Sequence, residues 1–450
     1  MTHNPALVAR DLAVLWHPCT QMKDHETIPL VPIKTAQGVW LEDYDGNRYL
    51  DAISSWWVNL FGHANPYINA ALKDQLEQLE QVIFAGFSHE PAITLAEQLV
   101  TLAPDGLERC FFADNGSAAV EVALKMSFHY WLNCQQPQKT RFITLENSYH
   151  GETLGALAVG NVALYKQTYA PLLMEVITVP GPDCYHREAG ESWADYSTRR
   201  FALMEQTLAE HANTVCAVII EPLVQCAGGM RMYDPVYLKL LRQACDKYQV
   251  HLIADEIAVG FGRSGTLFAC EQAAISPDFM CLSKGLTGGY LPLAAVLTTA
   301  AVYQAFYADY NAGTAFLHSH SYTGNALACR AGVATLALFE QYGTLNKNRL
   351  LAQTLAKVAV PFHHHPNIAE VRQTGMILAL ELVKNKRSRE PYPGQERRGT
   401  RIYQYALGKG VLLRPLGNVV YFMPPYVISA AELHYMAEVA WDAIQYAIKE

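Results

Sequence analysis

Two reactive side chains stand where short apolar segments end. Lys284 follows FMCLS and Asp255 closes HLIAD, and both segments have the length and composition of buried strands. In open α/β sheets, ligands bind beyond the carboxyl ends of the strands. A lysine amine there can form a Schiff base with a carbonyl compound, and a carboxylate there can hold a ring nitrogen protonated. A lone lysine at such a place is more often a surface residue that starts a turn, so the two residues carry weight as a pair.

A third segment, FFADNGSAAVEVALKM, predicts an anion site. Gly116 and Ser117 follow the strand-like run RCFFA and begin a helix, whose free N–H groups and dipole attract a phosphate. Taken by itself, Ser117 is equally an ordinary helix cap. Tyr149, after the strand-like run RFITL, could stack on a flat ring or simply pack at the strand end. An amine, a carboxylate and a phosphate cup together are what pyridoxal 5'-phosphate requires.

The elements that must position these residues alternate between helices and short apolar strands from about residue 66 to 330. Helices are expected over residues 90–103, 117–132, 196–211 and 235–248. The strand-like runs are RCFFA, RFITL, EVITV, CAVII, HLIAD, FMCLS and LAAVLTT. Continuous apolar strands between helices indicate an α/β domain with a mostly parallel sheet that is covered on both faces. Residues 1–65, with a hairpin signal at Asp45-Gly46, and residues 331–450 are expected to form a smaller α+β domain.

Composition excludes several classes of protein. The chain has 450 residues, of which 51% are hydrophobic and 17% charged, and this is too apolar for a disordered chain. A net charge of −8 without a basic block disfavours nucleic acid and anionic membranes as partners. The start of the chain lacks the pattern of a secretory signal, so a cytoplasmic protein is expected. The uncharged stretch 285–308 is long enough to span a bilayer, but its glycines and proline predict a loop, a strand and a short helix.

Metal chemistry is not expected. The ten cysteines include no C-x-x-C pair, which removes the main support for a zinc ribbon or a thioredoxin-like motif. The three adjacent residues His363, His364 and His365 cannot share one face of a helix or strand. They are interpreted as a solvated turn before Pro366.

Further motifs fall in an order that resembles the class III (ω-) aminotransferases. They are NSYHGET, IIEP, IADEIAVGFGRSG, the Ser-Lys-Gly segment and HSHSYTGNALA. The resemblance extends from about residue 14 to 445 and implies the fold-type I architecture of pyridoxal phosphate enzymes. It assigns Lys284 to the covalent bond with the cofactor, Asp255 to the pyridine nitrogen, and Gly116 and Ser117 to the phosphate.

The same resemblance assigns the remaining contacts of the cofactor. Tyr149 is expected to stack on the ring and touch the substrate, with Ile257 on the other face. Ser319, His320 and Ser321 match a segment that reaches across a homodimer interface towards the phosphate, with Ser319 expected beside the substrate.

Substrate identity is implied by a second group of segments. WHPCTQM, DAISSWWVNLFGHANP, IIEPLVQCAGGMRMY and LLRPLGNVVYFMPPY resemble the branch of the family that acts in biotin biosynthesis. That branch implies S-adenosylmethionine as amino donor and 8-amino-7-oxononanoate as acceptor. Trp56 matches its substrate-contacting tryptophan, and Arg414 matches the arginine that binds the distal carboxylate of the keto acid. Cys19 stands where the branch usually has a tyrosine associated with substrate recognition, so the fine detail of the substrate site is expected to differ.

Other functions remain open at this point. The nearest is another ω-aminotransferase, for lysine, ornithine, 4-aminobutyrate or a diamine. A racemase or aminomutase of the same fold would also use the cofactor residues, but would release no 2-oxo acid. A non-enzymatic, cofactor-binding regulator is disfavoured because Lys284, Asp255 and the phosphate loop are present together.

Overall fold

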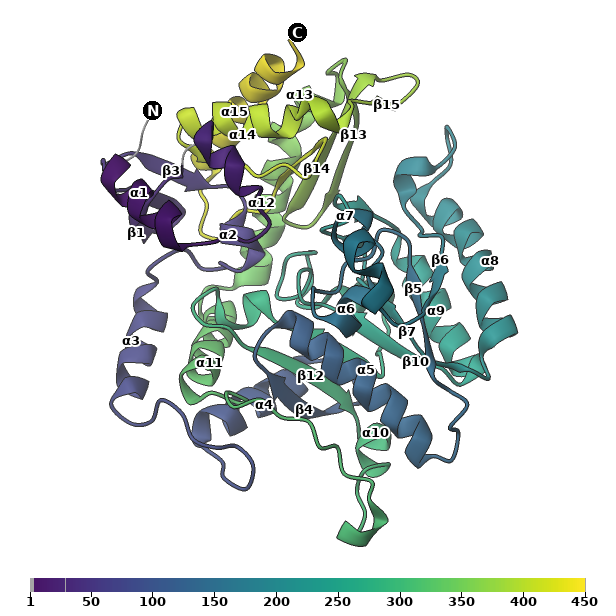
Figure 1. The fold of residues 1–450 in the computed structure, drawn as a ribbon. Helices are drawn as coiled ribbons and strands as arrows, with labels where there is room; N and C mark the ends of the chain where they lie inside the picture. The colour runs from purple at the N-terminus through teal and green to yellow at the C-terminus, as the bar shows by residue number, and fades with distance from the viewer. Residues whose placement is uncertain (1–3, 29, 450) are drawn as a thin grey trace. The chain divides into compact units, whose positions relative to one another are not determined.

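The structure, a computed structural model, describes residues 4–28 and 30–449, and the chain divides into two compact units (Figure 1). Unit 1 comprises Met1–Pro66, Gln353–Val371 and Leu378–Glu450. Unit 2 comprises Tyr67–Ala352 and Arg372–Ile377. The boundary expected near residue 330 falls inside α11 (Ala326–Gln341), and the structure places the whole of that helix in unit 2.

Unit 2 is built on a seven-stranded sheet with the strand order β4-β12-β11-β10-β7-β5-β6. Its strands are β4 (Leu107–Ala113), β5 (Arg141–Leu145), β6 (Ile177–Val179), β7 (Val215–Ile220), β10 (His251–Asp255), β11 (Phe279–Leu282) and β12 (Ala294–Thr299). β12 runs antiparallel to both β4 and β11, and the other neighbours are parallel. Every residue of β7, β10 and β11 is buried, as expected for strands covered on both faces. The mostly parallel sheet predicted from the sequence is therefore confirmed.

Helices surround this sheet. They are α3 (Pro66–Leu76), α4 (Glu90–Leu102), α5 (Gly116–Asn133), α6 (Leu154–Val159), α7 (Ala163–Lys166), α8 (Trp193–His211), α9 (Pro235–Tyr248), α10 (Ala300–Gln304) and α11. α5 packs against β11 and β12, and α8 lies against α9 (Figure 1). α8 begins three residues earlier than expected because Ser192 caps it, accepting a hydrogen bond from Asp195 N.

The uncharged stretch 285–308 forms the rest of a short turn, β12 and the short helix α10, as predicted. Among residues 4–28 and 30–449, no helix is both long and apolar enough to cross a membrane.

Unit 1 contains two smaller sheets. The first has the order β1-β2-β3-β16, formed by β1 (Ile33–Gln37), β2 (Trp40–Asp43), β3 (Arg48–Asp51) and β16 (Val411–Leu412). The second contains β13 (Ile368–Thr374), β14 (Ile377–Asn385), β15 (Glu390–Pro391) and β17 (Val419–Phe422). The helices of unit 1 are α1 (Pro5–Val14), α13 (Val360–His363), α14 (Arg398–Gly408) and α15 (Ala430–Ile448). A further helix, α12 (Thr344–Val358), begins in unit 2 and ends in unit 1. The turn predicted at Asp45-Gly46 joins β2 to β3, and Gly46 adopts a φ of +84° there.

The histidine tract differs in part from its interpretation as a solvated turn. His363 and His364 are exposed, but His365 is buried. Its ring packs edge-on against Trp441, and its Nε2 lies 2.8 Å from Nε2 of Gln445 on α15. The side chains of adjacent residues point in different directions. The sequence pattern of three histidines therefore gives no sign that one of them, His365, is buried. Among the described residues no group of three or more histidine, cysteine, aspartate or glutamate side chains could hold a metal ion.

The segment Ser54–Trp57, labelled α2, has an unusual backbone. All four residues have positive φ, at 52°, 46°, 72° and 73°. The left-handed region costs about 1–2 kcal/mol for each residue that carries a Cβ. Such a run persists only where its surroundings fix it in place.

Burial of His251 predicts a loss of stability in acid. His251 begins β10, its Nδ1 lies 2.9 Å from Ser127 Oγ on α5, and its ring packs on Trp131. Burial lowers the pKa of His251 from 6.5 to about 4, with the charge of Asp278 opposing the shift and those of Lys139 and Arg242 adding to it. Between pH 6.5 and pH 4, His251 is protonated in the unfolded chain but stays neutral in the native state. Stability from this group is therefore present above pH 6.5 and is lost as the pH falls towards 4.

We expect His251→Gln to weaken the dependence of the unfolding free energy on pH. Between pH 7 and pH 4.5 the native protein should lose about 2 kcal/mol more unfolding free energy than the variant, as measured by urea titration. Equal losses in the two proteins would show that His251 is not the titrating group.

Candidate active site

Lys284 lies at the end of the buried strand β11, at the first residue of a short 3₁₀ turn (Lys284–Thr287). Its backbone is left-handed, with a φ of +40°. Desolvation lowers the pKa of the Lys284 amine, although the charges of Asp255, Cys226 and Glu221 oppose the shift. A larger fraction of the amine is therefore neutral, and the neutral amine is the nucleophilic form.

Asp255 occupies the corresponding end of β10, next to β11 in the sheet. The carboxylate is buried; its Oδ1 accepts a hydrogen bond from Ile257 N (3.1 Å) and its Oδ2 lies 2.7 Å from Nδ1 of His150. A carboxylate pairs with the Nδ1–H tautomer of the ring, because it can only accept. The hydrogen bond from His150 fixes the orientation of the carboxylate.

His150 was not predicted as a site residue, although it stands beside Tyr149 in NSYHGET. It is buried, and its Nε2 has no hydrogen-bond partner within the described residues. Sequence spacing gives no signal for this contact, because His150 and Asp255 are 105 residues apart.

Glu221 is the second residue that sequence reasoning did not assign. It directly follows β7, and its carboxylate accepts hydrogen bonds from Tyr149 N (2.9 Å) and Cys226 N (3.0 Å). Burial raises the pKa of Glu221 well above its usual range, and the negative charge of Asp255 adds to this effect. The positive charge of Lys284 opposes it. Glu221 thus ties the backbone of Tyr149 to the end of β7.

The predicted anion site lies at the start of α5 and stays a prediction. Asn115 caps the helix by accepting a hydrogen bond from Ala118 N, and Gly116 is the first helical residue. A Cβ at Gly116 would lie 2.9 Å from Cγ2 of Ile257, so only glycine allows this approach. Ser117 Oγ lies 2.7 Å from Thr153 Oγ1 and also accepts a hydrogen bond from Thr153 N.

The segment 319–321 lies close to that helix start. His320 Nδ1 is 2.9 Å from a carboxylate oxygen of Asp114, the residue before the helix cap. Ser319 and Ser321 are exposed. Their expected contacts with substrate and with a partner's phosphate stay predictions.

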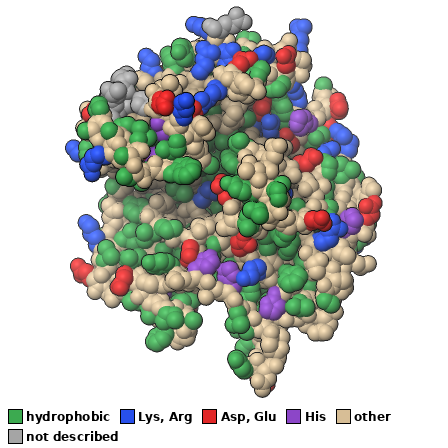
Figure 2. Space-filling model, in the orientation of Figure 1, with side chains coloured by type: hydrophobic (Ala, Val, Ile, Leu, Met, Phe, Trp, Pro, Cys, Tyr) green, Lys and Arg blue, Asp and Glu red, His purple; other side chains and the backbone are tan. Residues whose placement is uncertain are grey.

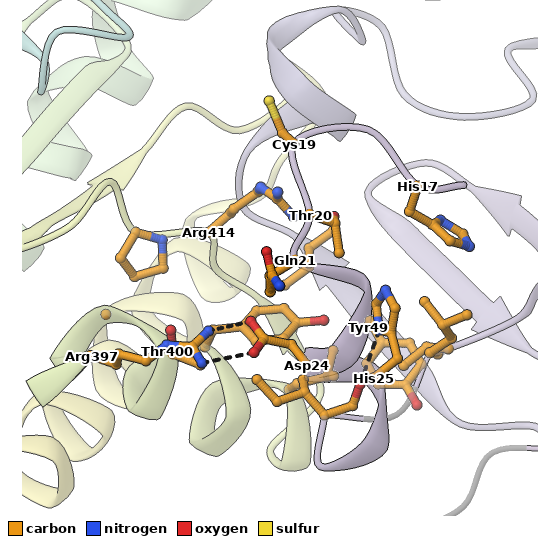
Figure 3. A pocket seen from close by; sticks show the side chains of 18 of the residues that line it. His17, Cys19, Thr20, Gln21, Asp24, His25, Tyr49, Arg397, Thr400 and Arg414 are labelled. Carbon is orange, nitrogen blue, oxygen red and sulfur yellow. Dashed lines mark hydrogen bonds and ion pairs between the residues drawn. The ribbon is translucent and has the colours of Figure 1, made fainter. Parts of the chain in front are cut away.

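Unit 1 carries three of the five predicted substrate residues, namely Cys19, Trp56 and Arg414, whereas Tyr149 and Ser319 belong to unit 2. β3 and β16 are parallel neighbours, Trp56 follows β3 and Arg414 follows β16, so both lie beyond the carboxyl ends of adjacent strands. The Arg414 guanidinium carbon lies 4.8 Å from the ring centroid of Trp56, in cation–π geometry. Cys19 is exposed and, with Arg414, lines a cavity of about 550 Å³ (Figure 3). Figure 3 also shows the two-point ion pair between Arg397 and Asp24 in this cavity.

The fold and the residues at the strand ends of unit 2 define a pyridoxal phosphate enzyme of the transaminase type. A sequence profile of the class III aminotransferases matches residues 21–444, and the chain belongs to this family. Its cofactor is pyridoxal 5'-phosphate, and its activity is that of an aminotransferase. Both expectations from the sequence are confirmed.

Named relatives narrow the similarity further. The adenosylmethionine-8-amino-7-oxononanoate aminotransferase of Helicobacter pylori is 47% identical over 438 residues, covering 96% of each chain. The enzyme of the same name from Geobacter sulfurreducens is 43% identical over 94% of each chain. Among solved structures, that enzyme from Methanocaldococcus jannaschii superposes with a TM-score of 0.93 at 35% identity, covering 99% of this chain and 100% of the other. The ω-transaminase of Pseudomonas jessenii, solved in complex with PMP, has a TM-score of 0.93 at 30% identity, covering 98% of each chain.

The residues of unit 2 fit the cofactor of the family. Gly116 lets the start of α5 pack against Ile257, where a Cβ would collide, and the first N–H groups of this helix would attract a phosphate. Asp255 is held by His150 with its carboxylate ready to keep a pyridine nitrogen protonated. Lys284 supplies an amine whose pKa burial has lowered.

Proposed function

We propose that this protein transfers an amino group from S-adenosylmethionine to 8-amino-7-oxononanoate, which gives 7,8-diaminononanoate in the biosynthesis of biotin in the cytoplasm. The Arg414–Trp56 pair is the observation that carries the proposal, because an arginine held over an aromatic ring presents its N–H groups to a carboxylate. The names of the relatives at 43–47% identity support the choice of substrates.

The chemistry divides between the cofactor and the chain. When bound, pyridoxal phosphate supplies an aldehyde that takes up the amino group and a cationic ring that withdraws electrons from the reacting carbon. Asp255 keeps the ring nitrogen protonated, and His150 fixes that carboxylate. The Lys284 amine would accept the proton from the substrate carbon and donate it to the carbon that was the aldehyde of the cofactor. Tyr149 and Ile257 would hold the two faces of the ring, and Gly116 and Ser117 would hold the phosphate.

Substrate recognition is assigned to unit 1. Arg414 binds the distal carboxylate of the keto acid, and Trp56 provides an apolar wall for its chain. Cys19 offers a thiol, a weaker hydrogen-bonding group than a phenol. Because Cys19 and Arg414 line the same cavity, a change at residue 19 alters the surroundings of the carboxylate site.

We also propose a homodimer. Leu317 and Tyr322, on either side of Ser319–Ser321, are 91% and 65% exposed, and Tyr310 is 99% exposed. Large apolar side chains at such exposure favour an interface with a second copy of the chain. Figure 2 shows further hydrophobic side chains on the surface of unit 2. The dimer would bring the segment 319–321 of one protomer to its partner, as the family resemblance implies.

A spectral screen of half-reactions tests the proposed donor. Purified enzyme with bound pyridoxal phosphate is mixed with S-adenosylmethionine, lysine, ornithine, 4-aminobutyrate or a diamine in separate cuvettes. The absorption band of the pyridoxal form should disappear with S-adenosylmethionine. Adding 8-amino-7-oxononanoate should then restore it. Bleaching by lysine or another amine, with none by S-adenosylmethionine, would overturn the donor while leaving the acceptor to be tested by itself.

Arg414→Ala is expected to weaken the acceptor half-reaction selectively. Loss of a charge-assisted carboxylate contact should raise the KM for 8-amino-7-oxononanoate about 10- to 100-fold. The half-reaction with the donor should remain largely intact, as measured by stopped-flow absorbance. Arg48→Ala is a matched control, because Arg48 lies 4.7 Å from the ring of Trp40 in the same sheet but carries no assigned role. Equal damage to both half-reactions would contradict a role specific to the keto acid.

A further inference from the structure

The Ser54–Trp57 segment is a single left-handed helical turn. Ser55 and Trp56 have φ/ψ values of 46°/53° and 72°/44°, close to the mirror image of an ordinary helix. Trp57 N donates to Ile53 O (2.8 Å) and Val58 N donates to Ser54 O (3.0 Å). These are the i to i−4 bonds of a helix, formed here with the disfavoured hand.

The carboxylate of Asp51 holds this turn by hydrogen bonds. Asp51 ends β3, its side chain is fully buried, and its Oδ1 accepts hydrogen bonds from Ser55 N (2.9 Å) and Ile53 N (3.4 Å). Its Oδ2 accepts from Ser55 Oγ (2.7 Å) and from His63 Nε2 (3.0 Å). Nδ1 of His63 faces the amide nitrogen of Asn59 at 3.2 Å. Because a carboxylate can only accept, the bond to Asp51 requires a proton on Nε2 of His63.

The outer residues of the turn, Ser54 and Trp57, are hydrogen-bonded to β17 and to the residue that follows it. Ser54 Oγ donates to Met423 O (2.7 Å), and Trp57 Nε1 donates to Tyr421 OH (3.0 Å). Both side chains are buried. Trp56, between them, is directed outward and is 39% exposed beside Arg414.

Handedness decides where Trp56 points. Consecutive side chains rotate in opposite senses around left- and right-handed helices. The side chains of Ser54 and Trp57 are fixed in the interior by their hydrogen bonds. If the turn were right-handed, the side chain of Trp56 would point in a different direction. The contact between Trp56 and Arg414 therefore depends on the bonds that keep the turn left-handed.

We propose that Asp51 and His63 are positioning residues for the carboxylate of the substrate. They act by holding the left-handed turn that sets Trp56 against Arg414. This inference rests on the proposed function only in taking Arg414 as the carboxylate ligand. Neither Asp51 nor His63 contacts the reacting atoms in this role.

The kinetic test uses Asp51→Asn, which keeps the volume but weakens the bonds to Ser55 and His63. The KM for 8-amino-7-oxononanoate should rise about tenfold while kcat stays within about twofold. Cofactor affinity should not change, because the cofactor residues belong to unit 2. Asp43→Asn is the matched control. Asp43 is also buried in this sheet and accepts bonds from Asn47 and Tyr49, but it holds the β2–β3 turn.

A second substitution, Ser55→Gly, distinguishes a positioning role of Asp51 from a general loss of stability. Glycine adopts a φ of +46° without steric cost, whereas alanine does not. In the Asp51→Asn background, Ser55→Gly should bring the KM back towards the native value, and Ser55→Ala should not. His63→Gln, which is less disruptive, should raise the KM in the same direction as Asp51→Asn and keeps the test available if Asp51→Asn folds poorly.

A readout independent of the substrate completes the design. The seven tryptophans are labelled with 5-fluorotryptophan, and the ¹⁹F signal of Trp56 is assigned by its loss in Trp56→Phe. That signal should shift in Asp51→Asn and return in the double variant with Ser55→Gly. An unchanged signal, or a shifted signal with unchanged KM, would overturn the inference. If the signal behaves as expected but the native enzyme does not accept 8-amino-7-oxononanoate, the proposed substrate fails and the KM comparison is made with the keto acid that the enzyme accepts.

Discussion

Lys284→Ala is expected to abolish transamination while leaving a folded protein that still binds pyridoxal phosphate. A general base in the transition state contributes about 10²- to 10⁴-fold, and Lys284 also supplies the covalent attachment of the cofactor. The rate should therefore fall by at least about 10⁴-fold, as measured by single-turnover absorbance with S-adenosylmethionine. Lys284→Arg should be equally inactive, because a guanidinium does not give up its proton in a protein.

The control for this result is Lys247→Ala. Lys247 lies on α9 and is paired with Glu205 at the surface, so its removal should leave the rate unchanged. The variants are compared by circular dichroism and by the amount of cofactor that remains after gel filtration. Activity of Lys284→Ala near the native level would contradict the assignment of Lys284 as the residue that binds the cofactor covalently.

The position of Lys284 could be predicted because it depends on where two parallel strands of the sheet end. FMCLS and HLIAD are both short and apolar, and parallel strands bring their carboxyl ends to one edge of the sheet. Lys284 and Asp255 then lie near each other whatever the details of the loops. The direction of β12 could not be predicted in the same way, since an apolar run carries no information on whether a strand is parallel or antiparallel to its neighbours.

The partners of the predicted residues were hidden for a different reason. His150 and Glu221 act through single hydrogen bonds to Asp255 and to the backbone of Tyr149, over separations of 105 and 72 residues. No periodicity marks such contacts, because they depend on how the loops close after the strands have paired. The left-handed turn at Ser54–Trp57 was equally invisible, since neither serine nor tryptophan favours positive φ and the bonds from Asp51 impose it.

Asp255→Asn is expected to lower the rate of both half-reactions by at least about 10³-fold, or about 4 kcal/mol in transition-state free energy. An amide carries no charge to keep the pyridine nitrogen protonated, so the ring withdraws electrons poorly when the proton leaves the substrate carbon. Both half-reactions pass through that step, and this distinguishes the variant from Arg414→Ala.

The neighbouring residue gives the sharpest control. Glu256 is also buried, and burial raises its pKa to about 7, but its carboxylate accepts hydrogen bonds from Ala269 N and Cys270 N and takes no part in the cofactor site. Glu256→Gln should therefore stay within about tenfold of the native rate. His150→Asn should fall between the two variants, because it leaves the Asp255 charge in place but removes the hydrogen bond that orients it. A loss of only about tenfold in Asp255→Asn would show that this carboxylate is not the partner of the ring nitrogen, however well its place at the end of β10 suits that role.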